Sequence, residues 1–98
     1  MVKHQYRSRN DIIASILEAA NGNRARATEI QFKAYISHGL LKEYLVFLIE
    51  NDLLEYIEGE RAFKTSPNGM QFLRTYNQMS ELVTLTTATK KPGSEFLS

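Results

Sequence analysis

Few side chains in this 98-residue sequence have the type and spacing that catalysis or metal binding requires. The sequence has no cysteine, which leaves no thiolate nucleophile, no disulfide and no sulfur-rich zinc site. A metal or acid–base role for His38 needs partner groups, and the other histidine, His4, lies near the N-terminus. Glu58 and Glu60 flank a turn glycine, where carboxylates are solvated and not held in a cleft. The sequence therefore predicts no enzymatic activity, no cofactor, no metal and no small-molecule substrate.

Basic side chains offer a different chemistry, which is the binding of phosphate groups. The formal net charge is only +1, from 12 basic and 11 acidic residues, but the distribution of charge matters more than the total. Basic residues dominate the first part of the chain, and acidic residues dominate between positions 50 and 60. Phosphate contacts would position the protein on a nucleic acid without specifying a sequence. The candidates for such contacts are Arg7, Arg9, Arg24, Arg26 and Lys33.

The elements that must position these residues follow from the spacing of apolar side chains. Helical spacing with a capping residue in front predicts a helix over 9–21 after Ser8, a short helix after Thr28, and a helix over 38–51 after Ser37. Arg26-Ala27 is predicted to pair as a very short strand. We expect residues 1–8 to be a flexible basic segment.

The apolar period then changes from helical to alternating, which predicts two strands. These are Leu53–Ile57 and Arg61–Thr65, joined by a turn at Glu58-Gly59-Glu60. Ser66-Pro67 is a typical helix start and predicts a fourth helix that ends near Val83. The compact domain is therefore expected over 9–83, followed by a flexible tail over 84–98.

The order helix, helix, helix, hairpin, helix predicts an α+β fold, mostly α, of the winged helix-turn-helix type: three helices, a two-stranded wing and a C-terminal fourth helix. Several segments between about residues 7 and 80 also resemble the archaeal winged-helix regulator family. They are Arg7-Ser8-Arg9, Asp11-Ile12-Ile13, Ile16 to Ala20, Lys33 to Ser37, Leu41 to Leu45, Asn51 to Tyr56, Phe63 to Gly69 and Phe72-Leu73. The resemblance implies a transcriptional regulator. Some relatives are chromatin-type proteins that dimerise through a long C-terminal helix, whereas the fourth helix predicted here ends near Val83.

The third helix is the main candidate for DNA contacts, because the second helix of a helix-turn-helix motif enters the major groove with its N-terminal residues at the base edges. Lys42 could reach a guanine or a phosphate, and the helix N-terminus at Ser37 could bind a phosphate. The alternative is an ordinary solvated helix face. The candidate residues are Ser37, His38, Gly39, Leu40, Lys42 and Glu43.

The hairpin is the second candidate for DNA contacts. Arg61 and Lys64 could touch the backbone, but Glu58 and Glu60 at the tip oppose an approach to phosphates within the screening length of ~10 Å. We expect a supporting wing with Arg61 as its best contact, and a wing without DNA contacts is the alternative.

The fourth helix carries an apolar stripe at coiled-coil spacing, formed by Phe72, Tyr76, Met79 and Val83. The stripe either packs on the first helix and the sheet or forms a two-fold interface. Both uses are compatible, with the early residues in the core and the later ones between subunits, so a homodimer is predicted.

Two functions compete at this point. The first is a double-stranded DNA-binding regulator or nucleoid-associated protein of the cytoplasm. No apolar run is long enough to cross a bilayer, and no signal peptide is evident, so no membrane partner is expected. The second is a winged helix that binds another protein, which the acidic wing and the near-neutral charge permit. A steep salt dependence of duplex binding distinguishes the first from the second.

Overall fold

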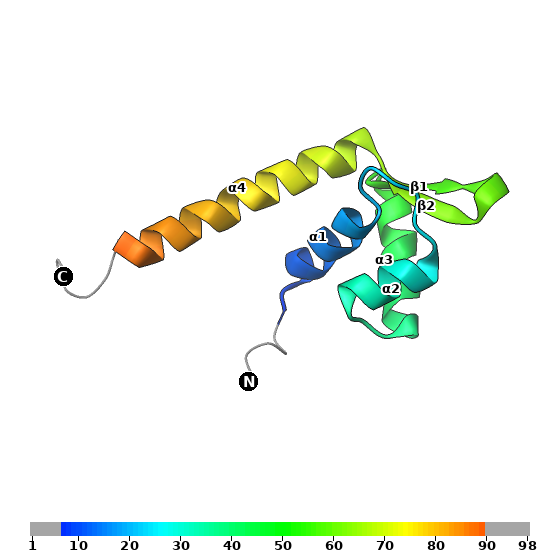
Figure 1. Ribbon diagram of the computed structural model, residues 1–98, viewed down its shortest axis with the longest axis horizontal. Helices are drawn as coiled ribbons and strands as arrows, with labels where there is room; N and C mark the ends of the chain where they lie inside the picture. Colours follow the sequence, from blue (N-terminus) through cyan, green and yellow to red (C-terminus); the bar gives the residue numbers. More distant parts are fainter. Residues whose placement is uncertain (1–6, 90–98) are drawn as a thin grey trace.

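The computed structural model describes residues 7–89, with side chains described as far as Leu82. Three helices form a compact body, a two-stranded wing extends from it, and a long fourth helix follows (Figure 1). This confirms the predicted order of elements and the fold. The elements are α1 (Arg9–Ala19), α2 (Ala27–Ala34), α3 (His38–Glu50), β1 (Leu54–Ile57), the 3₁₀ turn η2 (Glu58–Glu60), β2 (Ala62–Thr65) and α4 (Pro67–Thr89).

Helix α1 begins at the predicted capping residue. The Ser8 Oγ accepts a hydrogen bond from the Asp11 N–H at 3.1 Å, and the Asp11 carboxylate accepts one from the Ser8 N–H at 3.0 Å. This capping box satisfies two amide groups that have no partner within the helix. Ser8, expected in a flexible segment, is thus held in place by α1. After the helix, Gly22 has a φ of 85°, a conformation that glycine adopts at little cost.

The predicted start of α2 at Thr28 is wrong by two residues. The capping position is Arg26, whose N–H donates to the Glu29 carboxylate at 2.9 Å. A glutamate three positions into a helix can reach back to the amide of the capping residue, and this contact fixes the earlier start. The short strand is also displaced, because Ala25 pairs with Phe63 through two backbone hydrogen bonds of 2.8 and 2.9 Å.

The wing is an antiparallel hairpin whose register pairs Leu54 with Thr65 and Ile57 with Ala62. Leu54 and Thr65 are buried at its base, next to the helical body. The wing turns at η2, and Arg61 at the end of the turn has a φ of 51°. The hairpin therefore projects from the core as a narrow extension, with its tip formed by Glu58-Gly59-Glu60 (Figure 1).

A single hydrophobic core lies between the helices and the base of the wing. Seven large apolar side chains from the helices and the wing are all buried in one cluster. Burial of each large apolar side chain contributes roughly 1.5–3 kcal/mol. These seven residues are Ile16, Leu17, Leu41, Leu45, Leu48, Leu54 and Leu73.

Two buried hydroxyl groups at the end of β2 connect the wing to α1 and to the turn that follows α3. The Thr65 Oγ1 donates to the Leu17 carbonyl at 2.7 Å, and the Ser66 Oγ donates to the Asp52 carbonyl at 2.7 Å. The Ser66 Oγ also accepts the Gly69 N–H at 3.0 Å and so caps α4. These bonds fix the angle at which α4 leaves the wing, because a buried hydrogen-bonded hydroxyl cannot rotate away without losing its partner.

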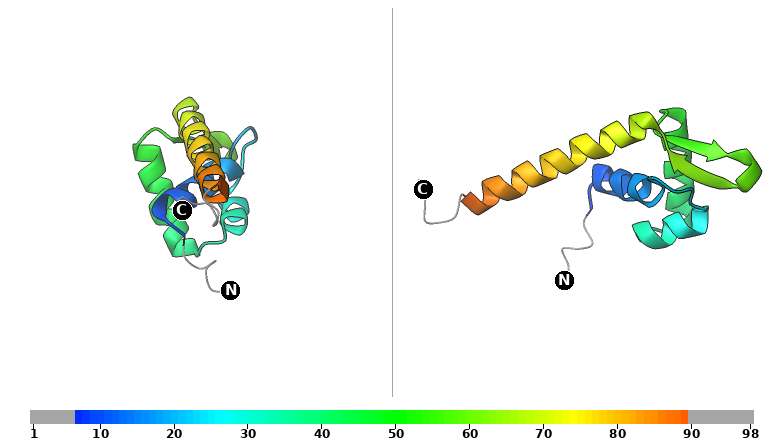
Figure 2. Two further views of the ribbon diagram at one scale, coloured as in Figure 1. Left: turned by 90° about the vertical axis from the view of Figure 1, so that its left-hand side faces the viewer. Right: turned by 45° about the horizontal axis from the view of Figure 1, so that its top comes forward.

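Helix α4 is longer than predicted. It has 23 residues and an expected length of ~34 Å, and its second half extends past α1 into solvent (Figures 1 and 2). The predicted end near Val83 is wrong, because the helix continues through the threonine-rich segment to Thr89. Threonine costs only a fraction of a kcal/mol in a helix that is already formed, ~0.7 at most. Of the expected flexible segments, 1–6 and 90–98 lie outside the described residues. Within 7–89, no helix has the length and apolar character to span a membrane.

Candidate nucleic-acid interface

Helix α3 has one buried face and one open face. Leu41, Leu45 and Leu48 point into the core, whereas Lys42 and Val46 lie on the exposed side. The turn of 100° per residue places Gly39, Lys42, Glu43 and Val46 in one stripe opposite the core. No described element of the chain covers these four residues, all of which are exposed. The stripe therefore forms a free surface about two helical turns long.

The N-terminal end of α3 carries a positive partial charge. The Ser37 Oγ accepts the Leu40 N–H at 3.2 Å, as its predicted role as a cap requires, and no acidic residue occupies the first turn. His38, Gly39 and Leu40 are exposed there. The helix dipole and the first-turn amides favour an anion at such an end. The six predicted residues of this helix start thus lie together on the surface.

The order of elements around α3 identifies the domain. Helices α2 and α3 are joined by a three-residue turn, and β1 and β2 follow as a hairpin beside them. The family model described as winged helix-turn-helix matches residues 6–84. The protein belongs to the winged helix-turn-helix family. No curated protein matches the sequence. Domains of this family typically bind DNA and are typically not enzymes.

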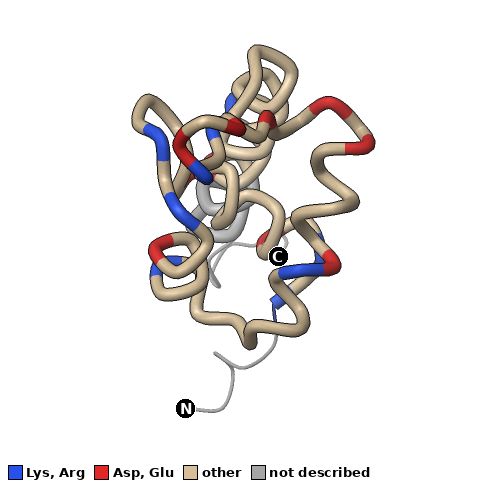
Figure 3. The backbone as a smooth tube through the Cα atoms, turned by 90° about the vertical axis from the view of Figure 1, so that its right-hand side faces the viewer, with Lys and Arg blue, Asp and Glu red and all other residues tan. Residues whose placement is uncertain are grey.

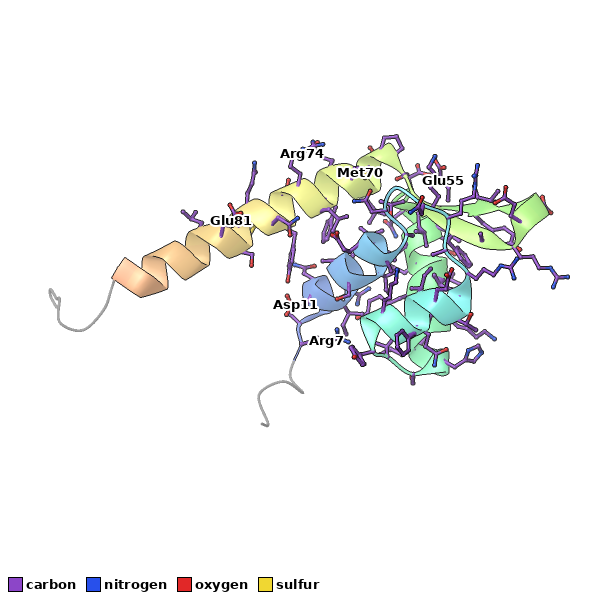
Figure 4. The ribbon with its side chains drawn as sticks, viewed as in Figure 1. Arg7, Asp11, Glu55, Met70, Arg74 and Glu81 are labelled. Carbon is purple, nitrogen blue, oxygen red and sulfur yellow. The ribbon has the colours of Figure 1, made fainter. Side chains whose placement is uncertain are left out.

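Within this winged helix-turn-helix domain, Arg7 positions the turn of the motif. Its guanidinium donates to the Ala34 carbonyl at 2.6 Å and to the Tyr35 carbonyl at 3.3 Å, and Figure 4 shows Arg7 lying at this end of α2. Tyr35 has a φ of 55°, so the turn passes through a conformation that is uncommon for a bulky residue. Arg7 was predicted to contact phosphates, but its guanidinium is engaged in fixing where α3 begins.

Arg9 is also engaged inside the domain. Its guanidinium lies 4.6 Å from the ring centroid of Phe47 and 5.8 Å from that of Tyr44. These cation–π contacts connect the start of α1 to the side of α3. Arg9 therefore supports α3 from its flank, a role that helical spacing alone does not reveal.

At the wing, Arg24 forms an ion pair with Glu60 at 3.2 Å, and both side chains are about half exposed (53% and 51%). This pair connects the loop before α2 to the wing tip. It neutralises one basic candidate and, at the same time, one of the two acids predicted to repel phosphates. Arg26, Lys33, Arg61 and Lys64 are exposed. Along the backbone at this end of the molecule, Lys and Arg positions are interspersed with Asp and Glu positions (Figure 3).

The apolar stripe of α4 divides into two parts. Phe72 and Tyr76 are partly buried against α1 and stack on each other at 6.3 Å. The Tyr76 hydroxyl donates to the Asp11 carboxylate, and Figure 4 shows Asp11 below α4. The side chains of Met79 and its neighbour Leu82 are 60% and 63% exposed. The side chain of Val83 lies outside the described part of the structure. The first part of the stripe therefore belongs to the monomer core.

The contact between Tyr76 and Asp11 is stable at neutral pH. The hydrogen bond from Tyr76 lowers the pKa of Asp11, and the capping contacts with Ser8 lower it further. The same bond raises the pKa of Tyr76. The carboxylate is therefore charged and the phenol protonated at neutral pH, which are the states that the bond requires.

Proposed function

We propose that this protein binds double-stranded DNA with α3 in the major groove and acts as a transcriptional regulator. The observation that carries the proposal is the open stripe of α3, which lies on the recognition helix of a winged helix-turn-helix domain. In such motifs the N-terminal part of this helix meets the base edges. The contacts near the bases are assigned to Ser37, His38, Gly39, Leu40, Lys42 and Glu43.

Backbone contacts are assigned to the basic residues that remain available around α3. Arg26 and Lys33 lie on the α2 side, and Arg61 and Lys64 lie on the wing, all exposed. Each adds a phosphate contact that positions the protein. Arg24 contributes less because Glu60 already pairs with it. We assign Arg7 and Arg9 to the support of α3 and not to DNA.

We further propose a homodimer through the second half of α4. Met79 and Leu82 are exposed apolar side chains on a helix that extends beyond the body of the monomer. Pairing of two such helices would bury these residues, and a two-fold axis would direct two recognition helices at half-sites one DNA turn apart, ~34 Å. A DNA-binding dimer of this kind would be associated with the nucleoid in the cytoplasm.

Lys42→Ala tests the assignment of α3. Lys42 is the one basic residue of the exposed stripe on α3, and its loss is expected to weaken duplex binding by roughly 1–3 kcal/mol with relaxed sequence preference. Fluorescence anisotropy with a labelled mixed-sequence duplex measures the effect. Arg74→Ala is the matched control, because Arg74 is an exposed cation on α4 that points away from the body (Figure 4). Equal losses in the two variants would contradict a special role for α3.

A second candidate function is the binding of a partner protein. The acidic wing tip favours it, because Glu58 and Glu60 stand where many wings approach the DNA backbone. A protein interaction of this kind would depend weakly on salt and would be insensitive to Lys42→Ala, whereas DNA binding depends steeply on salt.

A further inference from the structure

The open stripe of α3 ends in an apolar side chain, beyond the charged pair Lys42 and Glu43. Val46 is 56% exposed, although valine in a helix surface position has no stabilising role of its own. The helix sequence, HGLLKEYLVFLIE, contains no asparagine or glutamine to pair with adenine and no arginine to pair with guanine. Hydrogen bonding to bases from α3 is thus limited to a few side chains near its start. In the major groove, the one apolar group that base pairs present is the thymine methyl.

Gly39 leaves the start of this stripe open to a close approach. A Cβ added at Gly39 would meet nothing within 4 Å, so the packing of the protein does not require glycine there. Glycine in a helix lowers stability relative to alanine. Gly39, the second residue of α3, therefore leaves room for a partner to come close to the helix backbone.

Gly39 and Val46 are seven residues apart and point in nearly the same direction. Their separation along the helix axis is ~10 Å, about three base-pair steps of DNA. A helix whose first turn lies close to the bases at Gly39 would therefore bring Val46 against the base edges a few steps further along the groove.

We infer that α3 recognises thymine through its C5-methyl group, with Val46 as the contacting side chain and Gly39 as the point of close approach. The inference rests on the proposed binding of duplex DNA and names what the recognition helix selects. It gives the protein a preference for A·T-containing major grooves that does not depend on hydrogen bonds to the bases.

Replacement of thymine by uracil in the DNA tests this assignment, since uracil lacks only the methyl group. Anisotropy is measured with an alternating A·T duplex and with its uracil counterpart at low salt. The unmodified protein is expected to bind the uracil duplex about four-fold more weakly for each methyl lost from the contact. Val46→Ala is expected to bind the two duplexes equally. Met70→Ala, which shortens an exposed apolar side chain on α4, should keep the preference for thymine.

The possible outcomes separate the inference from the proposed function. Equal binding of the two duplexes by the unmodified protein would overturn the reading of thymine and leave DNA binding intact. A thymine preference that persists in Val46→Ala would overturn the role of Val46. Failure to bind either duplex would overturn DNA binding itself and the inference with it. Gly39→Ala should fold at least as stably as the parent and bind both duplexes more weakly, and unchanged affinity would overturn the close approach.

Discussion

Gly69→Ala is expected to destabilise the protein by about 3 kcal/mol, an effect large for a single methyl group. A Cβ at Gly69 would lie 2.2 Å from the Leu53 carbonyl oxygen and 2.6 Å from the Thr65 Cγ2. The Leu53 carbonyl cannot easily move, because it accepts a hydrogen bond of 3.1 Å from the Ser66 N–H at the start of α4. The substitution would therefore force α4 away from the body. Urea denaturation followed by circular dichroism measures the change in the free energy of unfolding.

Gly59→Ala is the matched control for this prediction. Gly59 lies at the wing tip, where an added Cβ would meet nothing within 4 Å and the φ is not positive. We expect its effect on the free energy of unfolding to stay within about 0.5 kcal/mol. Similar stabilities for the two variants would show that the close packing at Gly69 is not needed to hold α4.

Disruption of the proposed dimer is expected to have the largest effect on DNA binding. The double variant Met79→Glu, Leu82→Glu places two carboxylates on the exposed apolar part of α4, where pairing would bury them. The variant should be a folded monomer, because these side chains lie outside the monomer core. Loss of the second half-site should lower the affinity for DNA by about 100-fold or more.

Light scattering and anisotropy together measure this effect. Asn77→Glu is the control, since it adds a charge to the same part of α4 on the side away from Met79 and Leu82. The control should remain a dimer with nearly unchanged affinity. A parent protein that is monomeric at high micromolar concentration would remove the dimer from the proposal.

The core and most element boundaries could be predicted from the sequence because they depend on local signals. Ser8 and Ser37 cap the helices that follow them, and the alternation around Leu54 and Phe63 is that of strands. The end of α4 could not be placed in the same way. The sequence after Val83 is rich in threonine, which is a weak helix former but does not stop a helix. The helix therefore continues to Thr89, past the predicted end.

The roles of the basic residues depend on contacts between distant parts of the chain. Arg7 bonds to carbonyls at the end of α2, Arg9 lies over Phe47, and Arg24 pairs with Glu60. No local pattern separates these arginines from the exposed cations Arg26 and Arg61. For the same reason, sequence reasoning did not single out Val46, whose exposure becomes evident only when the neighbours of α3 are known.

The salt dependence of duplex binding tests the central claim most directly. The proposal assigns five exposed cations to the DNA: Lys42, Arg26, Lys33, Arg61 and Lys64. Each would release about one counterion from the DNA on binding. A plot of the logarithm of the binding constant against the logarithm of the salt concentration should therefore have a slope of about −4 to −5 per protomer. Anisotropy with a mixed-sequence duplex between about 50 and 200 mM salt gives this slope, and Arg61→Ala should reduce its magnitude by about one. No binding at the lowest salt concentration, or binding that does not change with salt, would contradict the account.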